Sequence, residues 1–194
     1  MNPVRTGMTK IRRMKTDKEE IRISKFLSLV LRHKPETIGL HLDDNGWAYT
    51  QELMEKLNSN DFEISIEDLK QLVTNNDKKR FQFSEDYSKI RASQGHSLKV
   101  DLGLEEKIPP RLLYHGTAEK NLDSIRKQGL VKGQRHHVHL SADKETAQKV
   151  GMRYGKPLVL KVRSEEMSKA GVRFYQSENG VWLTDTVPPD YLEE

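Results

Sequence analysis

Two short segments with the pattern of β-strands constrain the fold most strongly. Residues 112–117 read Leu-Leu-Tyr-His-Gly-Thr, an apolar run that ends in polar residues and is typical of a buried strand. Residues 135–141 read Arg-His-His-Val-His-Leu-Ser, in which apolar and polar residues alternate. A period of two places His139 and Ser141 on the same face of a strand. The sequence therefore predicts two strands that each carry a histidine and a small polar residue and that line one pocket.

The polar residues of the first strand suit a ligand-binding pocket. Gly116 has no Cβ and lets the backbone approach a ligand closely. Thr117 offers a hydroxyl, and His115 offers a ring with two different nitrogens. A purely structural role is the alternative, because a histidine on a strand is often simply solvated or hydrogen-bonded. At this point the pocket is a hypothesis.

Composition excludes several classes of protein. The chain has 194 residues, enough for one large domain or two small ones, and it has no cysteine, which excludes disulfides and thiolate chemistry. No apolar run reaches the roughly 18 residues of a membrane span, and the basic N-terminus lacks the apolar region of a secretory signal. We therefore expect a cytoplasmic protein. The net charge of +4 is a weak indication of a polyanionic partner.

The first half of the chain predicts a winged-helix domain. Residues 16–34 begin with a capping box, Thr-Asp-Lys-Glu, continue with apolar residues at helical spacing and must stop before a proline. A short strand with a turn at 43–46 is predicted at 38–47, further helices at 50–58 and from 65 onward, and a hairpin at 81–91. Three helices followed by a hairpin are typical of winged-helix domains, many of which bind nucleic acid and others only protein.

Two groups of basic residues in this half are candidates for function. Arg32 and His33 fall in the last turn of the first helix, where a cation also interacts favourably with the helix dipole, so a structural role explains them equally well. Lys78, Lys79 and Arg80 precede the hairpin and form either a solvated face or a phosphate contact. Arg80 is the better candidate for an organised site, because a planar guanidinium binds phosphate through two hydrogen bonds.

Pro109 and Pro110 mark a predicted boundary between two domains. We expect a basic flexible tail at 1–17, the winged-helix lobe at 18–108 and a second lobe of mixed α+β structure at 109–194. The second lobe contains neither Gly-x-Gly-x-x-Gly nor a Walker sequence, so it lacks both usual nucleotide cradles. The fold class predicted for the whole chain is α+β.

The histidines around residue 137 raise the alternative of a zinc site. His136, His137 and His139 are close in sequence, but successive residues of a strand point to opposite faces. A zinc ion needs ligands that converge from about four directions. We therefore predict that the protein has no metal site.

Several short motifs follow one another along the chain between about residues 20 and 192. They lie at 24–28 with 31–35, at 79–81, at 90–97, at 113–117, at 135–141 and at 179–184. Each motif is weak alone, but their order and number are specific. Together they resemble the RNA 2′-phosphotransferase (KptA) family.

The resemblance implies an N-terminal winged-helix lobe that binds RNA and a C-terminal ADP-ribosyltransferase-like lobe that binds NAD and consumes it as a co-substrate. The family removes an internal RNA 2′-phosphate, as left at a tRNA splice junction. First, the 2′-phosphate attacks the anomeric carbon of the nicotinamide ribose and nicotinamide leaves. Then the ribose 2″-hydroxyl attacks the phosphorus and releases the RNA 2′-hydroxyl. The products are repaired RNA, nicotinamide and ADP-ribose 1″,2″-cyclic phosphate.

The resemblance also implies roles for individual residues. The catalytic Arg-His-Arg-Arg tetrad of the family corresponds to Arg32, His33, Arg80 and Arg135. The NAD pocket corresponds to His115, Gly116, Thr117, His139, Leu140 and Ser141. Further contacts with RNA or phosphate are expected from Lys25, Lys34, Lys79 and His96. The chemistry agrees, because guanidinium groups hold and stabilise phosphate, and His33 is the tetrad member able to transfer a proton near neutral pH.

One position departs from related enzymes that modify proteins. Many of them carry a glutamate on the late strand where this chain has Val181, and a phosphate nucleophile needs less activation than an alcohol. A phosphate nucleophile agrees with RNA carrying a 2′-phosphate as the expected partner. We further expect no membrane, no metal and a monomer. Two alternatives stay open: ADP-ribosylation of a terminal RNA or DNA phosphate, and a non-catalytic winged-helix nucleic-acid-binding protein.

Overall fold

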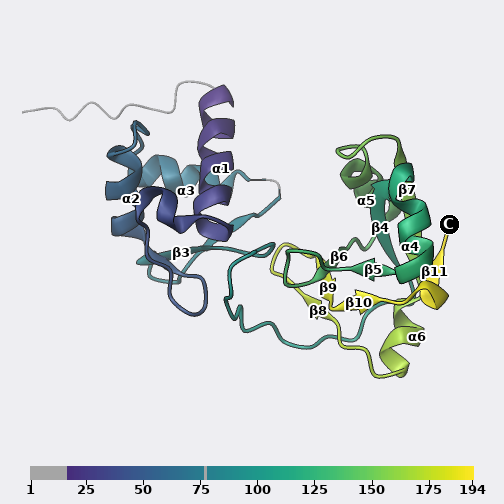
Figure 1. Cartoon of the computed structure of the whole chain (residues 1–194). Helices are drawn as coiled ribbons and strands as arrows, with labels where there is room; N and C mark the ends of the chain where they lie inside the picture. Colours follow the sequence, from purple (N-terminus) through teal and green to yellow (C-terminus); the bar gives the residue numbers. More distant parts are fainter. Residues whose placement is uncertain (1–16, 77) are drawn as a thin grey trace, which may run out of the picture.

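The structure, a computed structural model, describes residues 17–76 and 78–194 and is of mixed α+β type. Its helices and antiparallel strands gather around two separate hydrophobic cores. The elements of the first core lie on the left of Figure 1 and those of the second core on the right. The tail predicted at 1–17 and the start of the predicted capping box at Thr16 lie outside the described residues, except that Asp17 begins the first helix.

The first core is built from helices and one small sheet. Its elements are α1 (Asp17–Arg32), the 3-10 helix η1 (Pro35–Ile38), β1 (Ala48–Tyr49), α2 (Thr50–Asn58), α3 (Ile66–Thr74), β2 (Phe81–Phe83) and β3 (Lys89–Ala92). The strands form an antiparallel sheet in the order β1-β3-β2. Three α-helices thus precede the hairpin, as the sequence predicts.

Local chemistry explains where these elements begin and end. Ser65 caps α3 through a complete capping box with Asp68, and this helix begins next to residue 65, where the sequence predicts its start. The turn predicted at 43–46 is confirmed, but the strand predicted around it at 38–47 is wrong. Gly39 adopts a left-handed conformation with φ of 61°, and the carboxylate of Asp43 accepts hydrogen bonds from the N–H groups of Asn45 and Trp47, which folds this segment into turns.

The second core contains short helices and three sheets. Its elements are β4 (Leu113–Ala118), η2 (Glu119–Asn121), α4 (Leu122–Gln128), β5 (Leu130–Val131), β6 (Val138–Leu140), α5 (Lys144–Gly151), β7 (Pro157–Val162), α6 (Ser164–Lys169), β8 (Tyr175–Gln176), β9 (Trp182–Thr184), β10 (Thr186–Val187), η3 (Pro189–Tyr191) and β11 (Leu192–Glu193). The sheets have the strand orders β11-β7-β4, β6-β9-β8 and β10-β5. Helix α5 packs on β4 and β7.

The two strands predicted to line one pocket are joined directly. Tyr114 of β4 and Ser141, just after β6, form an antiparallel bridge, with N–O distances of 2.9 and 2.7 Å in the two directions. This bridge links the sheet of β4 to the sheet of β6. His115 and His139 therefore come from adjacent backbone segments, as the alternating pattern predicts.

A segment without helices or regular strands connects the two cores. It follows β3, runs along the bottom of Figure 1 and ends at β4. Near its end Glu106 already forms a bridge with Tyr175 of the second core. Among the described residues, no helix has the length and apolar character that crossing a lipid bilayer requires.

Candidate active site

Three arginines from distant parts of the chain form a cluster of positive charge. Arg32 ends α1, Arg80 precedes β2, and Arg135 precedes β6. Arg32 donates a hydrogen bond from Nη2 to the backbone oxygen of Arg80 over 3.2 Å. Burial, followed by the charges of Arg80 and Arg135, lowers the pKa of Arg32 to about 10. Several arginines whose charges act on one another in this way favour the binding of an anion between them.

The cluster has unused hydrogen-bonding capacity and an additional cation. Arg32 Nε is buried and has no hydrogen-bond partner among the described residues. A buried donor of this kind is satisfied when an anion such as phosphate binds. The pKa of Arg80 is lowered first by burial and then by the charge of Arg153, which follows α5. The positive cluster thus receives residues from both cores.

His33 follows Arg32 directly and faces the same site. Its Nδ1 lies 2.9 Å from the hydroxyl of Ser97. Its pKa is lowered by burial, then by the charges of Arg32 and Arg135, so the ring is neutral near pH 7. A neutral imidazole beside a cationic phosphate site is able to accept a proton during the reaction.

His33 lines a cavity together with residues of the second core. The cavity has a volume of about 410 Å³. Its lining consists of His33, Ser97, His115, Val131, Lys132, Gln134, Arg135, His137, Val138 and His139. The structure therefore brings two members of the predicted tetrad together with the two histidines predicted for the NAD pocket.

The side chain of His139 is hydrogen-bonded to two other side chains at this cavity. Its Nε2 lies 2.8 Å from Oε1 of Gln94, and its Nδ1 lies 3.4 Å from Nη1 of Arg135. Its backbone oxygen lies 3.0 Å from Nδ1 of His115. Burial, followed by the charge of Arg135, lowers the pKa of His139 to about 3. His139 is therefore neutral over the whole physiological range.

His115 is also neutral, and its tautomer follows from its partner. Burial lowers the pKa of His115, and the hydrogen bond to His139 only partly offsets this effect. A backbone oxygen accepts only, so Nδ1 of His115 carries the proton. Nε2 is then an acceptor, which suits an amide N–H or a sugar hydroxyl.

The other residues predicted for the NAD pocket have clear structural functions. A Cβ added to Gly116 would lie 1.7 Å from the backbone oxygen of Ala147, so the close packing of α5 on β4 requires glycine here. The hydroxyl of Thr117 accepts a hydrogen bond from Asn121 over 3.1 Å. Leu140 is buried in the second core, and Ser141 bridges to β4 through its backbone. Their contact with a dinucleotide stays a prediction.

The residues predicted to contact RNA lie in different settings. Lys25 and Arg80 line a second cavity of about 420 Å³ between α1 and the segment that precedes β2. Lys34 and Lys79 are exposed. His96 has only 1% of its surface exposed, and neither ring nitrogen has a hydrogen-bond partner among the described residues. These RNA contacts also stay predictions.

Sequence reasoning gave no individual role to several residues of the site. Gln94 and Ser97 belong to the motif at 90–97. Their turn-like context alone does not reveal that they contact His139 and His33. Lys132 and Gln134 line the same cavity without any sequence signal.

Among the described residues, no group of three or more histidines, aspartates and glutamates could hold a metal ion.

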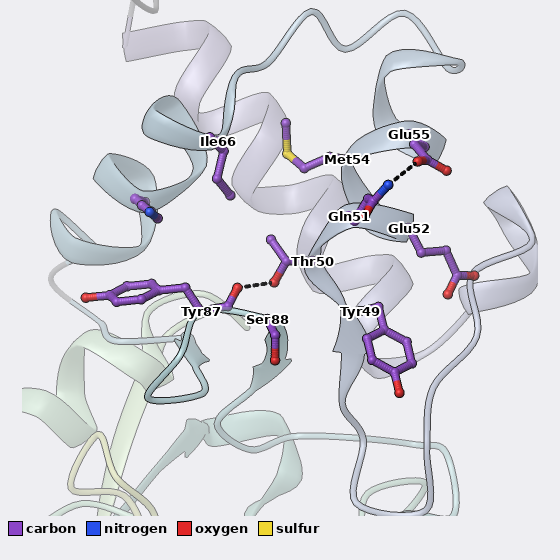
Figure 2. A pocket seen from close by; sticks show the side chains of 10 residues that line it. Tyr49, Thr50, Gln51, Glu52, Met54, Glu55, Ile66, Tyr87 and Ser88 are labelled. Carbon is purple, nitrogen blue, oxygen red and sulfur yellow. Dashed lines mark hydrogen bonds between the residues drawn. The ribbon is translucent and has the colours of Figure 1, made fainter.

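A larger cavity lies away from the predicted site. It has a volume of about 740 Å³ and is lined by residues of β1, α2, α3 and the turn between β2 and β3. Figure 2 shows Tyr49 and Tyr87 at this cavity, with Thr50 and Ser88 between them. None of the residues predicted for catalysis or for NAD binding lines it.

Comparison with known proteins gives one consistent result. The family model described as RNA 2′-phosphotransferase, Tpt1 / KptA family, matches residues 18–186. A protein of Flavobacterium johnsoniae named "Probable RNA 2′-phosphotransferase" is 60% identical over 171 residues, which are 88% of this chain and 94% of the relative. Proteins of the same name from Fusobacterium nucleatum and Escherichia coli O6:K15:H31 are 53% and 52% identical, over 90% and 91% of this chain and 98% and 97% of their own lengths.

Proposed function

Because the chain belongs to the RNA 2′-phosphotransferase Tpt1/KptA family, we propose that it removes an internal 2′-phosphate from RNA and consumes NAD in doing so. It is an enzyme, a transferase that acts on RNA. The observation that supports the mechanism best is the convergence of Arg32, Arg80 and Arg135 beside His33, at a cavity that His115 and His139 also line.

In the first step, an oxygen of the RNA 2′-phosphate attacks the anomeric carbon of the nicotinamide ribose. The bond between this carbon and the nicotinamide nitrogen breaks, and nicotinamide leaves with the bonding electrons. Arg32, Arg80 and Arg135 hold the phosphate in line with that carbon, because guanidinium groups bind phosphate with defined geometry. His115 offers Nε2 as an acceptor to the dinucleotide, and Lys132, whose Nζ lies 3.1 Å from Oδ1 of Asp185, lies at the same cavity.

In the second step, the 2″-hydroxyl of the ribose attacks the phosphorus and the RNA 2′-oxygen leaves. Negative charge on the phosphoryl oxygens grows in the transition state, and the arginine cluster stabilises it. The attacking hydroxyl loses a proton and the departing RNA oxygen gains one. Neutral His33 takes the proton of the 2″-hydroxyl through Nε2, since its Nδ1 is engaged with Ser97, and the imidazolium that forms is then able to give a proton to the departing RNA 2′-oxygen.

The family assignment also supports the finer description of the fold. We assign residues 18–108, with three helices followed by the β2–β3 hairpin, to a winged-helix RNA-binding lobe. Residues 109–194, with their three small sheets, correspond to an ADP-ribosyltransferase-like lobe. The protein acts as a monomer in the cytoplasm in this proposal, and the site needs no metal.

One incubation tests the proposed activity. The purified protein is mixed with NAD and an oligoribonucleotide that carries one internal 2′-phosphate. We expect RNA with a free 2′-hydroxyl, nicotinamide and ADP-ribose 1″,2″-cyclic phosphate in equal amounts. Unchanged RNA with intact NAD would contradict the proposal. RNA that gains a stable ADP-ribose at a terminal phosphate, with no reaction at the internal one, would instead support the terminal-phosphate alternative.

A further inference from the structure

Gln94 lies between the arginine cluster and the histidines of the cavity. It follows β3 at the start of the segment that connects the two cores, and its side chain reaches His139, 45 positions along the chain. The next residue, Gly95, has φ of +86°, and a Cβ there would lie 3.8 Å from Nη1 of Arg32 and 4.0 Å from Nε2 of His139. The turn at Gln94 and Gly95 is thus inserted between Arg32 and His139.

The hydrogen-bonding chain through His139 permits one arrangement of protons. A guanidinium donates only, so Nδ1 of His139 must be the acceptor for Nη1 of Arg135. In a neutral ring the proton then resides on Nε2, which donates to Oε1 of Gln94. If Gln94 presented its amide nitrogen instead, Nε2 of His139 would have to accept and Nδ1 would carry the proton. The N–H at Nδ1 would then face the guanidinium, which is also a donor.

Arg135 depends on this chain for its orientation. Its side chain is exposed, and the contact with His139 is the one hydrogen bond that this side chain makes within residues 17–76 and 78–194. A long exposed side chain samples many rotamers unless a contact holds it, because fixing it costs side-chain entropy. The contact that holds Arg135 exists only while Nδ1 of His139 is unprotonated.

We propose that Gln94 is a positioning residue, which fixes His139 in the Nε2–H tautomer and thereby aims the guanidinium of Arg135 at the phosphate. This role rests on the proposed function for its catalytic meaning, but the tautomer itself is a property of the protein without substrate. Gln94 reaches from the connecting segment to His139, which lines the cavity, so it also ties the site together across the two cores.

Nitrogen NMR of the substrate-free protein tests the tautomer directly. With ¹⁵N-labelled histidine, the ring of His139 in the wild-type protein should show a protonated Nε2 and an unprotonated Nδ1 at pH 7. In Gln94→Met, which has a similar shape but no acceptor, His139 should populate the other tautomer or exchange between both. Gln128→Met is the matched control, because Gln128 is an exposed glutamine whose amide contacts only Ser124. It should leave the His139 signals unchanged.

Kinetics then test what the tautomer does. Gln94→Met should lower the rate of nicotinamide release by about tenfold or more, the effect of one misplaced group in the transition state. Gln94→Glu retains an oxygen that accepts from Nε2, so it should keep the tautomer and recover part of that rate. An unaltered thermal midpoint in both variants establishes that the fold is intact.

Two results would overturn the proposal. The first is a wild-type His139 with the proton on Nδ1, and the second is Gln94→Met with an unchanged tautomer or an unchanged rate of nicotinamide release. Failure of the proposed function looks different: the wild-type protein would release no nicotinamide with 2′-phosphorylated RNA, while the dependence of the His139 tautomer on Gln94 would still be measurable.

Discussion

His33 and Ser97 are hydrogen-bonded across a separation of 64 residues, with Nδ1 of the imidazole 2.9 Å from the hydroxyl oxygen. The backbone of Ser97 is held in turn, because its N–H donates to the backbone oxygen of Arg32 over 3.0 Å. This pair fixes the ring of His33 at the end of α1 and leaves Nε2 for proton transfer. The orientation of His33 therefore depends on the connecting segment as well as on its own helix.

The first prediction concerns the protonation of His33. Burial and the charges of Arg32 and Arg135 lower its pKa, so protonation should occur only below pH 6.5. If the neutral ring takes the proton in the second step, that step should be constant above pH 7 and slow as the pH falls through the pKa. In Arg135→Gln one positive charge is gone, and an NMR titration should show the pKa of His33 raised toward 6.5. A pKa above 6.5 in the wild-type protein would contradict this picture.

The second prediction concerns sequence selectivity. Arg80 belongs to the arginine cluster that we propose holds the phosphate, and phosphate contacts carry no information on base sequence. Arg80→Ala should therefore weaken the reaction of every 2′-phosphorylated oligonucleotide by about the same factor. Measuring kcat/KM for a set of oligonucleotides that differ in the bases at the junction checks this. A loss confined to one junction sequence would assign Arg80 to base recognition.

The third prediction concerns metal ions. The described residues contain no cluster of side chains that could hold a metal, and the arginines supply the positive charge that a metal would otherwise provide. Phosphate removal with NAD should thus proceed at an unchanged rate in excess EDTA. Loss of activity in EDTA that a divalent cation restores would show that the reaction needs a metal.

The arrangement of the residues proposed for catalysis was partly accessible from the sequence. Pro35 places the end of α1 close to Arg32 and His33, and alternation at 135–141 predicts the face that His139 shares with Ser141. Both features are local, because a proline and a period of two act on neighbouring residues. The bridge between Tyr114 and Ser141 then confirms that the two strand segments lie together.

Features that depend on long-range contacts were not predictable in the same way. Gln94 and Ser97 act through side chains 45 and 64 positions away, and no local pattern encodes such a meeting. Gly116 was expected to make room for a ligand, whereas the atoms closest to its missing Cβ belong to α5. At 38–47 the predicted turn at 43–46 formed, but the predicted strand did not, because side-chain hydrogen bonds of Asp43 compete with strand pairing.

The fourth prediction concerns stability in acid. His96 is almost fully buried, and burial, followed by the charge of Arg32, lowers its pKa to about 3. Between pH 6.5 and 3 the unfolded chain binds a proton on this ring that the folded chain does not, so the free energy of unfolding falls as the pH falls. In His96→Leu the slope of the free energy of unfolding against pH should decrease by up to about 1.4 kcal/mol per pH unit, which is the contribution of one proton. Urea unfolding at several values between pH 6.5 and 4 measures the slope, and an equal slope in the variant would contradict the assignment.

The last prediction separates the two steps of the reaction. His115 and His139 line the cavity assigned to NAD, so their loss should mainly slow the first step, in which nicotinamide leaves. His33 lies beside the arginine cluster and should act in the second step, where a proton must move. Proton transfer by a positioned side chain is typically worth about 10²–10⁴-fold in rate, so His33→Ala should slow the second step by a factor in this range and let ADP-ribosylated RNA accumulate.

Single-turnover reactions with end-labelled RNA resolve the intermediate from substrate and product. If His33 only orients Arg32 at the end of α1, both steps slow together and no intermediate appears. Ser97→Ala provides an independent check, because it removes the partner of Nδ1 but keeps the imidazole and should produce a weaker form of the same defect. Accumulation of the intermediate with His139→Ala, but not with His33→Ala, would show that this division of labour is wrong even though the family assignment holds.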